Sequence, residues 1–276
     1  MLKDITLGQY YQADSKIHKL DPRVKLVGTI VYIISLFMFR NLTIYLFALL
    51  FLIFVIRMSR VPFSYIVRGL KAIVFLLIIT ALFNLFLTAG KPIVTIWKFS
   101  LTYEGIAAAF YLAVRLIFLI IGSSLMTLTT TPNQLTDGLE RLLGPLKKIK
   151  VPVHEISMMM SIALRFIPIL MEETDKIMKA QMARCADFES GNIIKKVKAL
   201  IPLLVPLFIS SFRRANDLAM AMEARCYQGG EGRTKMKPLI YKKQDYIAYA
   251  FLLCYLVLAI LLGKFLPLHV LQFFVK

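Results

Sequence analysis

The chain has 276 residues, 58% of them hydrophobic, and a mean hydropathy of +0.70. Soluble domains are about 45–50% apolar, so this composition argues against a soluble protein and for a membrane protein. The formal net charge of +18 would suggest nucleic acid in a soluble chain, but here Lys and Arg flank apolar runs. Basic residues collect in the cytoplasmic loops of membrane proteins, so we attribute the charge to topology and expect no nucleic acid partner.

Five apolar segments predict transmembrane helices, each of which takes about 20 mostly apolar residues. The run 26–56 is too long for one span and is interrupted at Arg40 and Asn41, so it predicts two helices joined by a tight turn. The other three spans are expected at 69–88, 105–128 and 246–265. The expected fold class is therefore all-α, a polytopic membrane protein with about five transmembrane helices.

The segment 131–245, between the fourth and last expected spans, is rich in both charged and apolar residues. Its first residues, Thr131 and Pro132, are typical of an N-cap and the first position of a short amphipathic helix. Two long helices are expected next, at 153–186 and 193–225, with prolines bending the start of the second.

Two apolar stretches inside these long helices, 156–171 and 199–212, are shorter than a normal span. Runs of that length are more often interfacial or buried helices. Counting both as spans gives a seven-span alternative. The number of spans remains odd, but residues 172–198 then lie outside the cell.

Charge decides the orientation of the five-span topology. The basic segments 1–25, 57–71 and 131–245 all fall on one side, which predicts an N-terminus inside and a C-terminus outside. The expected parts are a cytoplasmic N-terminal segment at 1–25, four transmembrane helices at 26–130, cytoplasmic helices at 131–245, and the last transmembrane helix with an outer tail at 246–276.

The most unusual motif is a repeat of Ala-Arg-Cys, at 183–185 and 224–226, with each copy at the end of an expected long helix. A small residue before Arg allows close approach, and the guanidinium is a planar fork of donors for carboxylates or carbonyls. The alternative is that each Arg caps the last carbonyls of its own helix. Two copies on paired helices favour docking to a partner.

A membrane-embedded enzyme acting on lipids or peptides is the alternative function. It would need clustered acids, His or Ser near the membrane face. The expected spans hold no Asp, Glu or His apart from edge residues, and Arg115 is their one embedded charge. The three cysteines and three histidines show no metal-ligand spacing, so we expect neither a catalytic residue nor a metal site.

Several stretches together resemble the transmembrane T component of energy-coupling factor (ECF) transporters, a branch of ABC importers for vitamins and trace nutrients. The resemblance covers essentially the whole chain. It rests on both Ala-Arg-X motifs and on ITLGQY at 5–10, DSKIHKLDPRVK at 14–25, and MEARCY at 222–227 running into GGEGRT at 229–234. In the family the third motif position is commonly Gly, whereas here it is Cys in both copies.

The resemblance implies a coupling subunit in the plasma membrane of a prokaryote, surrounded by membrane lipids. Two cytoplasmic ABC ATPases of the EcfA type, forming a heterodimer, would bind ATP and Mg²⁺, so no cofactor is expected in this chain. Its two long helices would cross, making 131–245 a coupling region, and a membrane S component would select the vitamin or nutrient.

The family's roles are carried over by position. The residues implied for ATPase docking are Ala183, Arg184, Cys185, Ala224, Arg225 and Cys226. The residues implied for contact with the S component are Met158, Met159, Ile162, Phe166, Leu203, Leu204, Leu207 and Phe208.

Overall fold

The computed structural model describes residues 10–38, 41–71, 73–88, 92–96, 99–186, 188, 192–230, 236 and 238–265. These residues form two compact units. We call the first, up to Gly138 and again from Leu239, the membrane unit. The second, between Leu139 and Pro238, is the long-helix unit. The sequence motif at 5–9, the Gly-rich stretch at 231–235 and the tail at 266–276 lie outside the described residues.

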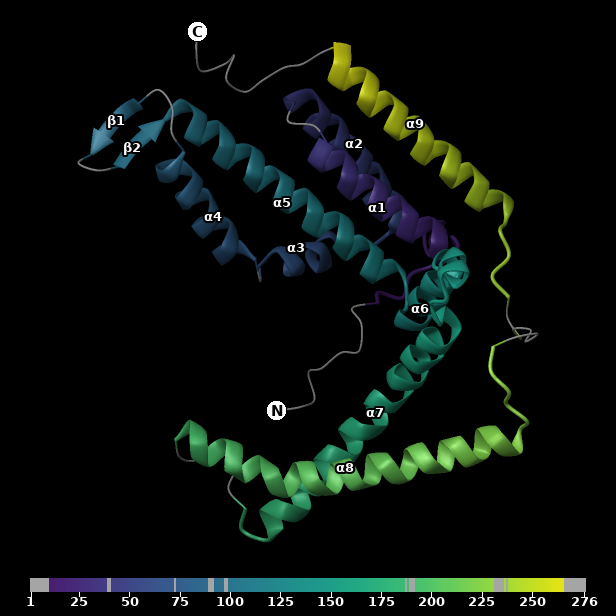
Figure 1. Ribbon diagram of the computed structural model, residues 1–276. Helices are drawn as coiled ribbons and strands as arrows, with labels where there is room; N and C mark the ends of the chain where they lie inside the picture. The colour runs from purple at the N-terminus through teal and green to yellow at the C-terminus, as the bar shows by residue number, and fades with distance from the viewer. Residues whose placement is uncertain are drawn as a thin grey trace. The chain divides into compact units, whose positions relative to one another are not determined.

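The membrane unit is a group of helices packed side by side, with one small hairpin (Figure 1). Its elements are α1 (Pro22–Met38), α2 (Leu42–Ser59), α3 (Phe63–Lys71), α4 (Val74–Leu87), β1 (Pro92–Ile96), β2 (Phe99–Thr102), α5 (Tyr103–Thr129), the first turns of α6 (Pro132–Leu142), and α9 (Lys243–Phe265). The helix α5 packs against α1, α2, α3 and α4, while α9 packs against α1 and α2.

The all-α fold class is confirmed, with one addition and one correction. Within the described residues the only sheet is the antiparallel hairpin of β1 and β2, in the segment expected to join two spans. The span expected at 69–88 is instead two helices, because the amphipathic, basic α3 ends at Lys71 and the strongly apolar α4 starts at Val74 after a 57° bend.

The number of candidate spans agrees with the expected five, but the helices that make up the five are not all the expected ones. Four described helices, α2, α5, α7 and α9, are long and apolar enough to cross a membrane, and α3 with α4 makes a fifth if counted as one bent span. With 17 residues, α1 is shorter than the usual span of about 20. The long helix α7 qualifies because of its apolar first half.

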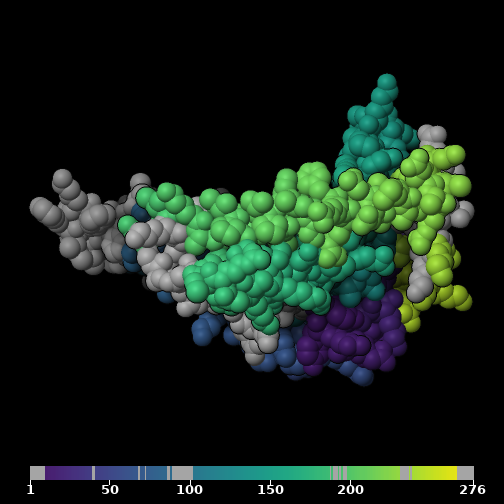
Figure 2. Space-filling view, turned by 90° about the horizontal axis from the view of Figure 1, so that it is seen from below, coloured from purple at the N-terminus to yellow at the C-terminus, as the bar shows by residue number. Residues whose placement is uncertain are grey.

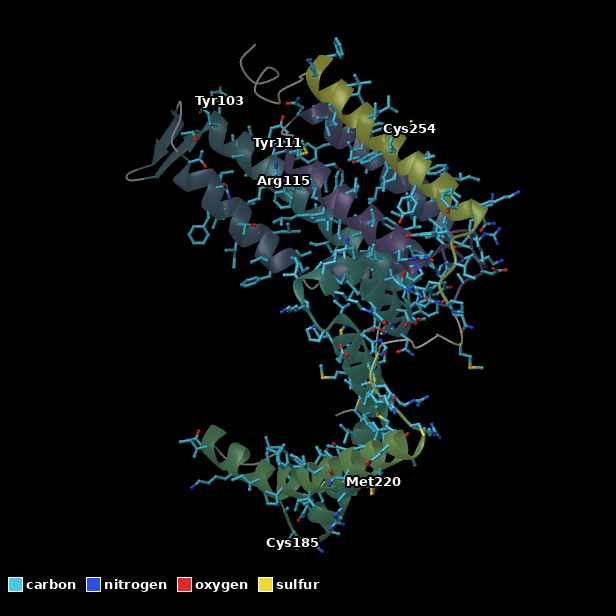
Figure 3. The ribbon with its side chains drawn as sticks, turned by 45° about the vertical axis from the view of Figure 1, so that its right-hand side comes forward. Tyr103, Tyr111, Arg115, Cys185, Met220 and Cys254 are labelled. Carbon is cyan, nitrogen blue, oxygen red and sulfur yellow. The ribbon has the colours of Figure 1, made fainter. Side chains whose placement is uncertain are left out.

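Aromatic side chains form the core of the membrane unit. The Tyr255 ring of α9 packs on the α2 rings of Phe51 and Phe47, with centroids 4.2 and 5.3 Å away. Its hydroxyl forms a 2.9 Å hydrogen bond with Ser35 of α1, so the polar end of a buried ring is satisfied. The expected embedded charge, Arg115, labelled in Figure 3, donates to the Tyr45 hydroxyl at 3.1 Å.

A buried carboxylate joins the starts of α1 and α9. Asp245, only 2% exposed, accepts a hydrogen bond from the Lys242 amide at 2.7 Å, which caps the N-terminus of α9. It also accepts one from the Asp21 amide at 2.8 Å. The Asp21 carboxylate in turn pairs with Arg23 at 2.7 Å. These contacts explain why the Asp-Pro-Arg stretch at 21–23 opens α1.

A buried lysine joins α1 to the end of α5. The Lys25 ammonium donates to the carbonyl oxygens of Thr129 at 2.8 Å and His18 at 3.3 Å. A cation at the last carbonyl of a helix also complements the helix dipole. Burial lowers the pKa of the His18 imidazole, whose Nε2 donates to the Tyr11 carbonyl at 2.9 Å. The segment before α1 is thereby held against the helix ends.

The long-helix unit contains the rest of α6, a short 3-10 helix, η1 (Gly144–Ile149), and two long helices, α7 (Val153–Ala183) and α8 (Ile193–Ala224). Both long helices were expected, and their starts are at the expected residues. The expected N-cap before α6 is also confirmed: Thr131 Oγ1 accepts from the Gln134 amide at 3.3 Å, and the Gln134 side chain accepts from the Thr131 amide at 3.2 Å.

The packing of Gly122 against Tyr32 yields a stability prediction. A Cβ at Gly122 would lie 2.8 Å from Tyr32 Cε1, and this ring is only 3% exposed. We expect Gly122→Ala to lower the free energy of unfolding by about 1–3 kcal/mol, because a tightly packed ring must move. In the control, Gly28→Ala, the nearest atom is Leu252 Cδ1 at 4.0 Å, and better helix propensity raises stability by up to about 1 kcal/mol. Equal melting temperatures of the two variants in detergent would contradict this packing argument.

Candidate functional site

The first Ala-Arg-Cys motif ends α7 with a Schellman cap. Arg184 is the C-cap residue, and Cys185 follows in the left-handed region with φ of +63°. The Cys185 amide donates to Met182 O, and the Ala186 amide donates to Gln181 O, both at 3.0 Å. These two bonds are the 5→2 and 6→1 pair that defines the motif.

The second copy ends α8 in the same way. Cys226 has a φ of +55°. Its amide donates to Glu223 O at 2.8 Å, and the Tyr227 amide donates to Met222 O at 3.0 Å. The repeat in the sequence is therefore a repeat in the structure. It also explains the family's usual Gly, because the third motif position has the positive φ that Gly adopts at no steric cost.

The backbone caps leave both arginine side chains unused. In the described part of the chain, no hydrogen bond or ion pair involves the guanidinium of Arg184 or Arg225, and both residues are exposed. Backbone amides bond two of the last carbonyls of each helix, and neither arginine side chain bonds any of them, which speaks against the helix-cap alternative. Ala183 and Ala224 are exposed beside them (Figure 3 labels Cys185 at the end of α7).

The two long helices cross, and polar contacts hold the crossing (Figure 1). The Glu173 carboxylate of α7 pairs with Arg214 of α8 and accepts a hydrogen bond from Ser210. Farther along, the Gln181 amide donates to the Pro202 carbonyl at 3.3 Å. These contacts join α7 and α8 through side chains on facing surfaces, as expected for a crossed pair.

Apolar side chains surround the crossing. A cavity of about 280 Å³ lies between the helices, lined by Ile162, Phe166 and Leu170 of α7 and by the α8 stretch from Ser211 to Met222. Ile162 and Phe166 were expected to contact an S component. They are half-buried at this crossing and offer only part of their surface.

The other expected S-component residues differ in exposure. Phe208 is 66% exposed, Met159 57% and Leu204 55%, whereas Leu203 is only 6% exposed and offers little surface. Met158 and Leu207 are half-buried.

Beside the expected Leu204 and Phe208, the structure shows further exposed apolar side chains within the stretch 199–212 of α8, the light green helix in Figure 2. We define the apolar stripe of α8 as Ile201, Leu204, Val205, Phe208, Ile209 and Phe212. These residues form two rows with i,i+4 spacing, 201–205–209 and 204–208–212, and this spacing in the sequence indicates a single face of the helix.

These features define a class, the polytopic helical membrane proteins, here with two crossed long helices that end in matching exposed motifs. The family model described as cobalt transport protein (CbiQ) matches residues 13–236. A Clostridium kluyveri protein is 59% identical over 260 residues, covering 94% of this chain and 95% of that protein. A Bacillus subtilis protein is 49% identical over 246 residues, covering 89% of this chain and 93% of that protein.

Both relatives are named energy-coupling factor transporter transmembrane protein EcfT. A third protein with this name, from Thermosediminibacter oceani, is 52% identical over 248 residues, covering 90% of this chain and 94% of that protein. The chain belongs to this family and is a membrane component of a bacterial ECF transporter. The resemblance inferred from the sequence is confirmed. Its relatives are named as transporter subunits rather than as enzymes, and the described residues contain no group of His, Cys, Asp and Glu that could hold a metal ion.

The left-handed cysteines yield a prediction with an internal control. We expect Cys185→Gly and Cys226→Gly to stabilise the last turn of each helix by about 1 kcal/mol, because a side chain at positive φ is strained. Cys254→Gly, at an exposed site inside α9, should instead destabilise its helix by about 1 kcal/mol. Hydrogen exchange of the amides near each substituted residue measures the stability of the local helix turn in each variant. Slower exchange in all three variants, or in none of them, would rule out this account.

Proposed function

We propose that this chain is the coupling subunit of its transporter, linking ATP hydrolysis by two cytoplasmic ATPase subunits to substrate uptake through a membrane S component. The observation that carries the proposal is the pair of matching helix ends, each with an unused, exposed arginine. Two equal ends suit two related partners, one for each motif. The ATPases would bind ATP and Mg²⁺, and the S component would select the vitamin or nutrient.

The chemistry of each end suits docking into a groove. The planar guanidinium of Arg184 or Arg225 can donate two parallel hydrogen bonds to a carboxylate or to carbonyls at a helix end. Exposed methionines lie close in sequence to each motif, with Met182 50% and Met220 61% exposed. A flexible thioether fills irregular apolar gaps, so each end combines a charged anchor with adaptable apolar contact.

The crossed pair supplies the mechanical connection. With 31 and 32 residues, α7 and α8 are each roughly 46–48 Å long at 1.5 Å per residue. Because Glu173, Ser210 and Arg214 join them at the crossing, a displacement of one helix end is passed to the other helix. Closure of two bound ATPases would therefore change the angle or position of the whole pair.

The apolar stripe of α8 is the proposed contact for the S component. Its side chains are exposed and apolar, and large exposed apolar patches mark interaction sites. The exposed Met159 of α7 would contribute in the same way. The partner that fits is the apolar surface of another membrane protein.

For the topology, we propose that 1–25 and 131–245 face the cytoplasm, that 26–130 and 246–276 contain the spans, and that the C-terminus is outside. In this arrangement the apolar half of α7 lies at the membrane interface instead of crossing it. Arg165 and Pro168 within that half, and the charged residues Glu172 and Glu173 directly after it, support an interfacial position.

Charge reversal tests ATPase docking. We expect Arg184→Glu or Arg225→Glu to weaken binding of one ATPase by about ten-fold or more, because truncating buried Arg anchors has effects of this size. The double variant should insert in the membrane yet lose copurifying ATPases and uptake. The matched control is Arg213→Glu, at an exposed position inside α8, and this variant should keep the copurifying ATPases and the uptake activity. Retention of both ATPases and of uptake by the double variant would exclude the docking role.

A substitution in the apolar stripe tests the S-component contact separately. We expect Phe208→Asp to abolish copurification of the S component while the ATPases remain bound, because a charge would be buried without a partner. Phe208→Leu keeps an apolar side chain and should retain the S component. If both variants bound it equally well, the contact would have to lie elsewhere.

A further inference from the structure

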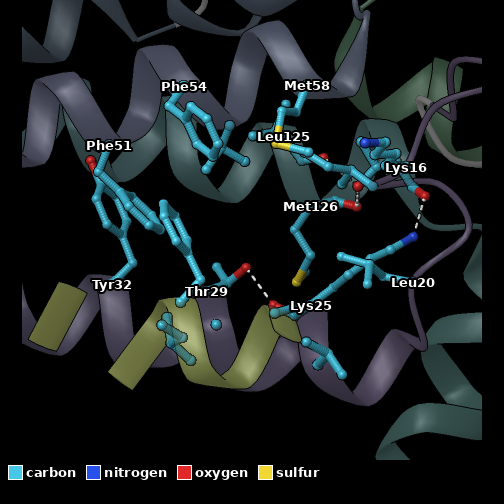
Figure 4. A pocket seen from close by; sticks show the side chains of 18 of the residues that line it. Lys16, Leu20, Lys25, Thr29, Tyr32, Phe51, Phe54, Met58, Leu125 and Met126 are labelled. Atoms are coloured by element: carbon cyan, nitrogen blue, oxygen red, sulfur yellow. Dashed lines mark hydrogen bonds between the residues drawn. The ribbon is translucent and has the colours of Figure 1, made fainter. Parts of the chain in front are cut away.

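A half-open cavity of about 550 Å³ lies within the membrane unit, between α1, α2, α5 and α9 (Figure 4). Aromatic side chains form much of its wall, among them Phe51 and Phe54 of α2 and Phe251 of α9. Two small residues, Gly28 of α1 and Ala248 of α9, leave the space open. Its volume falls within the roughly 300–1,000 Å³ of sites that bind small molecules.

One end of the cavity is positively charged. Lys16 and Lys25 both line it, and no Asp or Glu is among its lining residues. In Figure 4 these lysines lie at the end opposite Phe51 and Tyr32. The Lys25 ammonium has three N–H donors, and two of them are used by the carbonyls of Thr129 and His18. Asp21 and Asp245 lie near enough to attract its charge, but among the described residues no carboxylate lies within ion-pair distance, so Lys25 contributes positive charge and a third N–H at this end of the cavity.

The mouth of the cavity opens on an apolar surface. Ile247 of α9 is 68% exposed and Phe54 of α2 is 46% exposed, and both line the cavity. In a membrane protein, such apolar exposed side chains face lipid. A ligand therefore reaches the cavity sideways from the bilayer, which favours an amphiphile over a water-soluble molecule.

We propose that the cavity binds an anionic phospholipid, with one acyl chain between the helices and the phosphate at Lys16 and Lys25. An acyl chain matches the apolar wall, and the half-open side leaves the second chain in the bilayer. Basic pockets between transmembrane helices bind anionic lipid head groups in this way. The bound lipid would connect α1, α2, α5 and α9 at the helix ends that Lys25 and Asp245 already join.

The test counts lipids bound to the full chain by native mass spectrometry. The protein is purified in detergent, stripped of lipid, and titrated with dioleoyl phosphatidylglycerol, dioleoyl phosphatidylcholine or oleate. The cavity-filling variant is Ala248→Leu, and its control is Ala250→Leu on the exposed side of α9. The charge variant is Lys16→Ala, and its control is Lys19→Ala, an exposed lysine that pairs with Asp14 outside the cavity.

We expect one phosphatidylglycerol to bind at least five-fold more tightly than phosphatidylcholine or oleate. Lys16→Ala should weaken phosphatidylglycerol binding about five-fold, the effect of one lysine near an anionic lipid. Ala248→Leu should weaken both phospholipids ten-fold or more, and neither control should change binding.

Equal affinity for the two phospholipids, tighter binding of oleate, or normal binding by Ala248→Leu would overturn the proposal. Because Lys16 is on the surface, its variant remains informative even if the filled cavity impairs folding.

Discussion

Every helix leaves backbone N–H and C=O groups unpaired at its ends, and this chain depends on how those groups are satisfied. In the membrane unit, side chains from distant parts of the sequence supply the partners. Asp245 caps its own helix and also accepts the amide that begins α1, while Lys25 of α1 reaches the last carbonyl of α5. The helix ends are thus tied to one another, which sets where α1, α5 and α9 start and stop together.

The long-helix unit satisfies its helix ends differently, and the difference carries the functional argument. At α7 and α8 the chain turns through a left-handed Cys, so backbone amides bond the last carbonyls. Charged side chains that would otherwise serve as caps remain available. The membrane unit uses charged side chains to tie helix ends together, whereas at its two motif ends the long-helix unit presents an arginine on its surface.

Much of this arrangement could be predicted from the sequence, because the signals were local. The starts of α6, α7 and α8 followed from a capping residue, a proline and the length of each periodic run. Both motifs were placed correctly at helix ends. The positive φ of Cys185 and Cys226 was not predictable, because Cys has no preference for the left-handed region and only Gly would have indicated it.

Other features depend on contacts between distant residues, so composition alone did not indicate them. The cavity needs four helices at once, and the periodic pattern of α8 does not indicate that Leu203 is buried while Leu204 beside it is exposed. The bend between Lys71 and Val74 separates an amphipathic helix from an apolar one, yet a hydropathy window averages across both.

The apolar stripe of α8 also affects how much of this protein a cell can hold. Six large apolar side chains on one helix remain safe from aggregation only while something covers them. Copies made in excess of whatever covers the stripe would expose it and become targets for proteolysis. If an S component covers the stripe as proposed, synthesis of this chain would have to keep pace with synthesis of that partner, and a surface suited to assembly would also limit abundance.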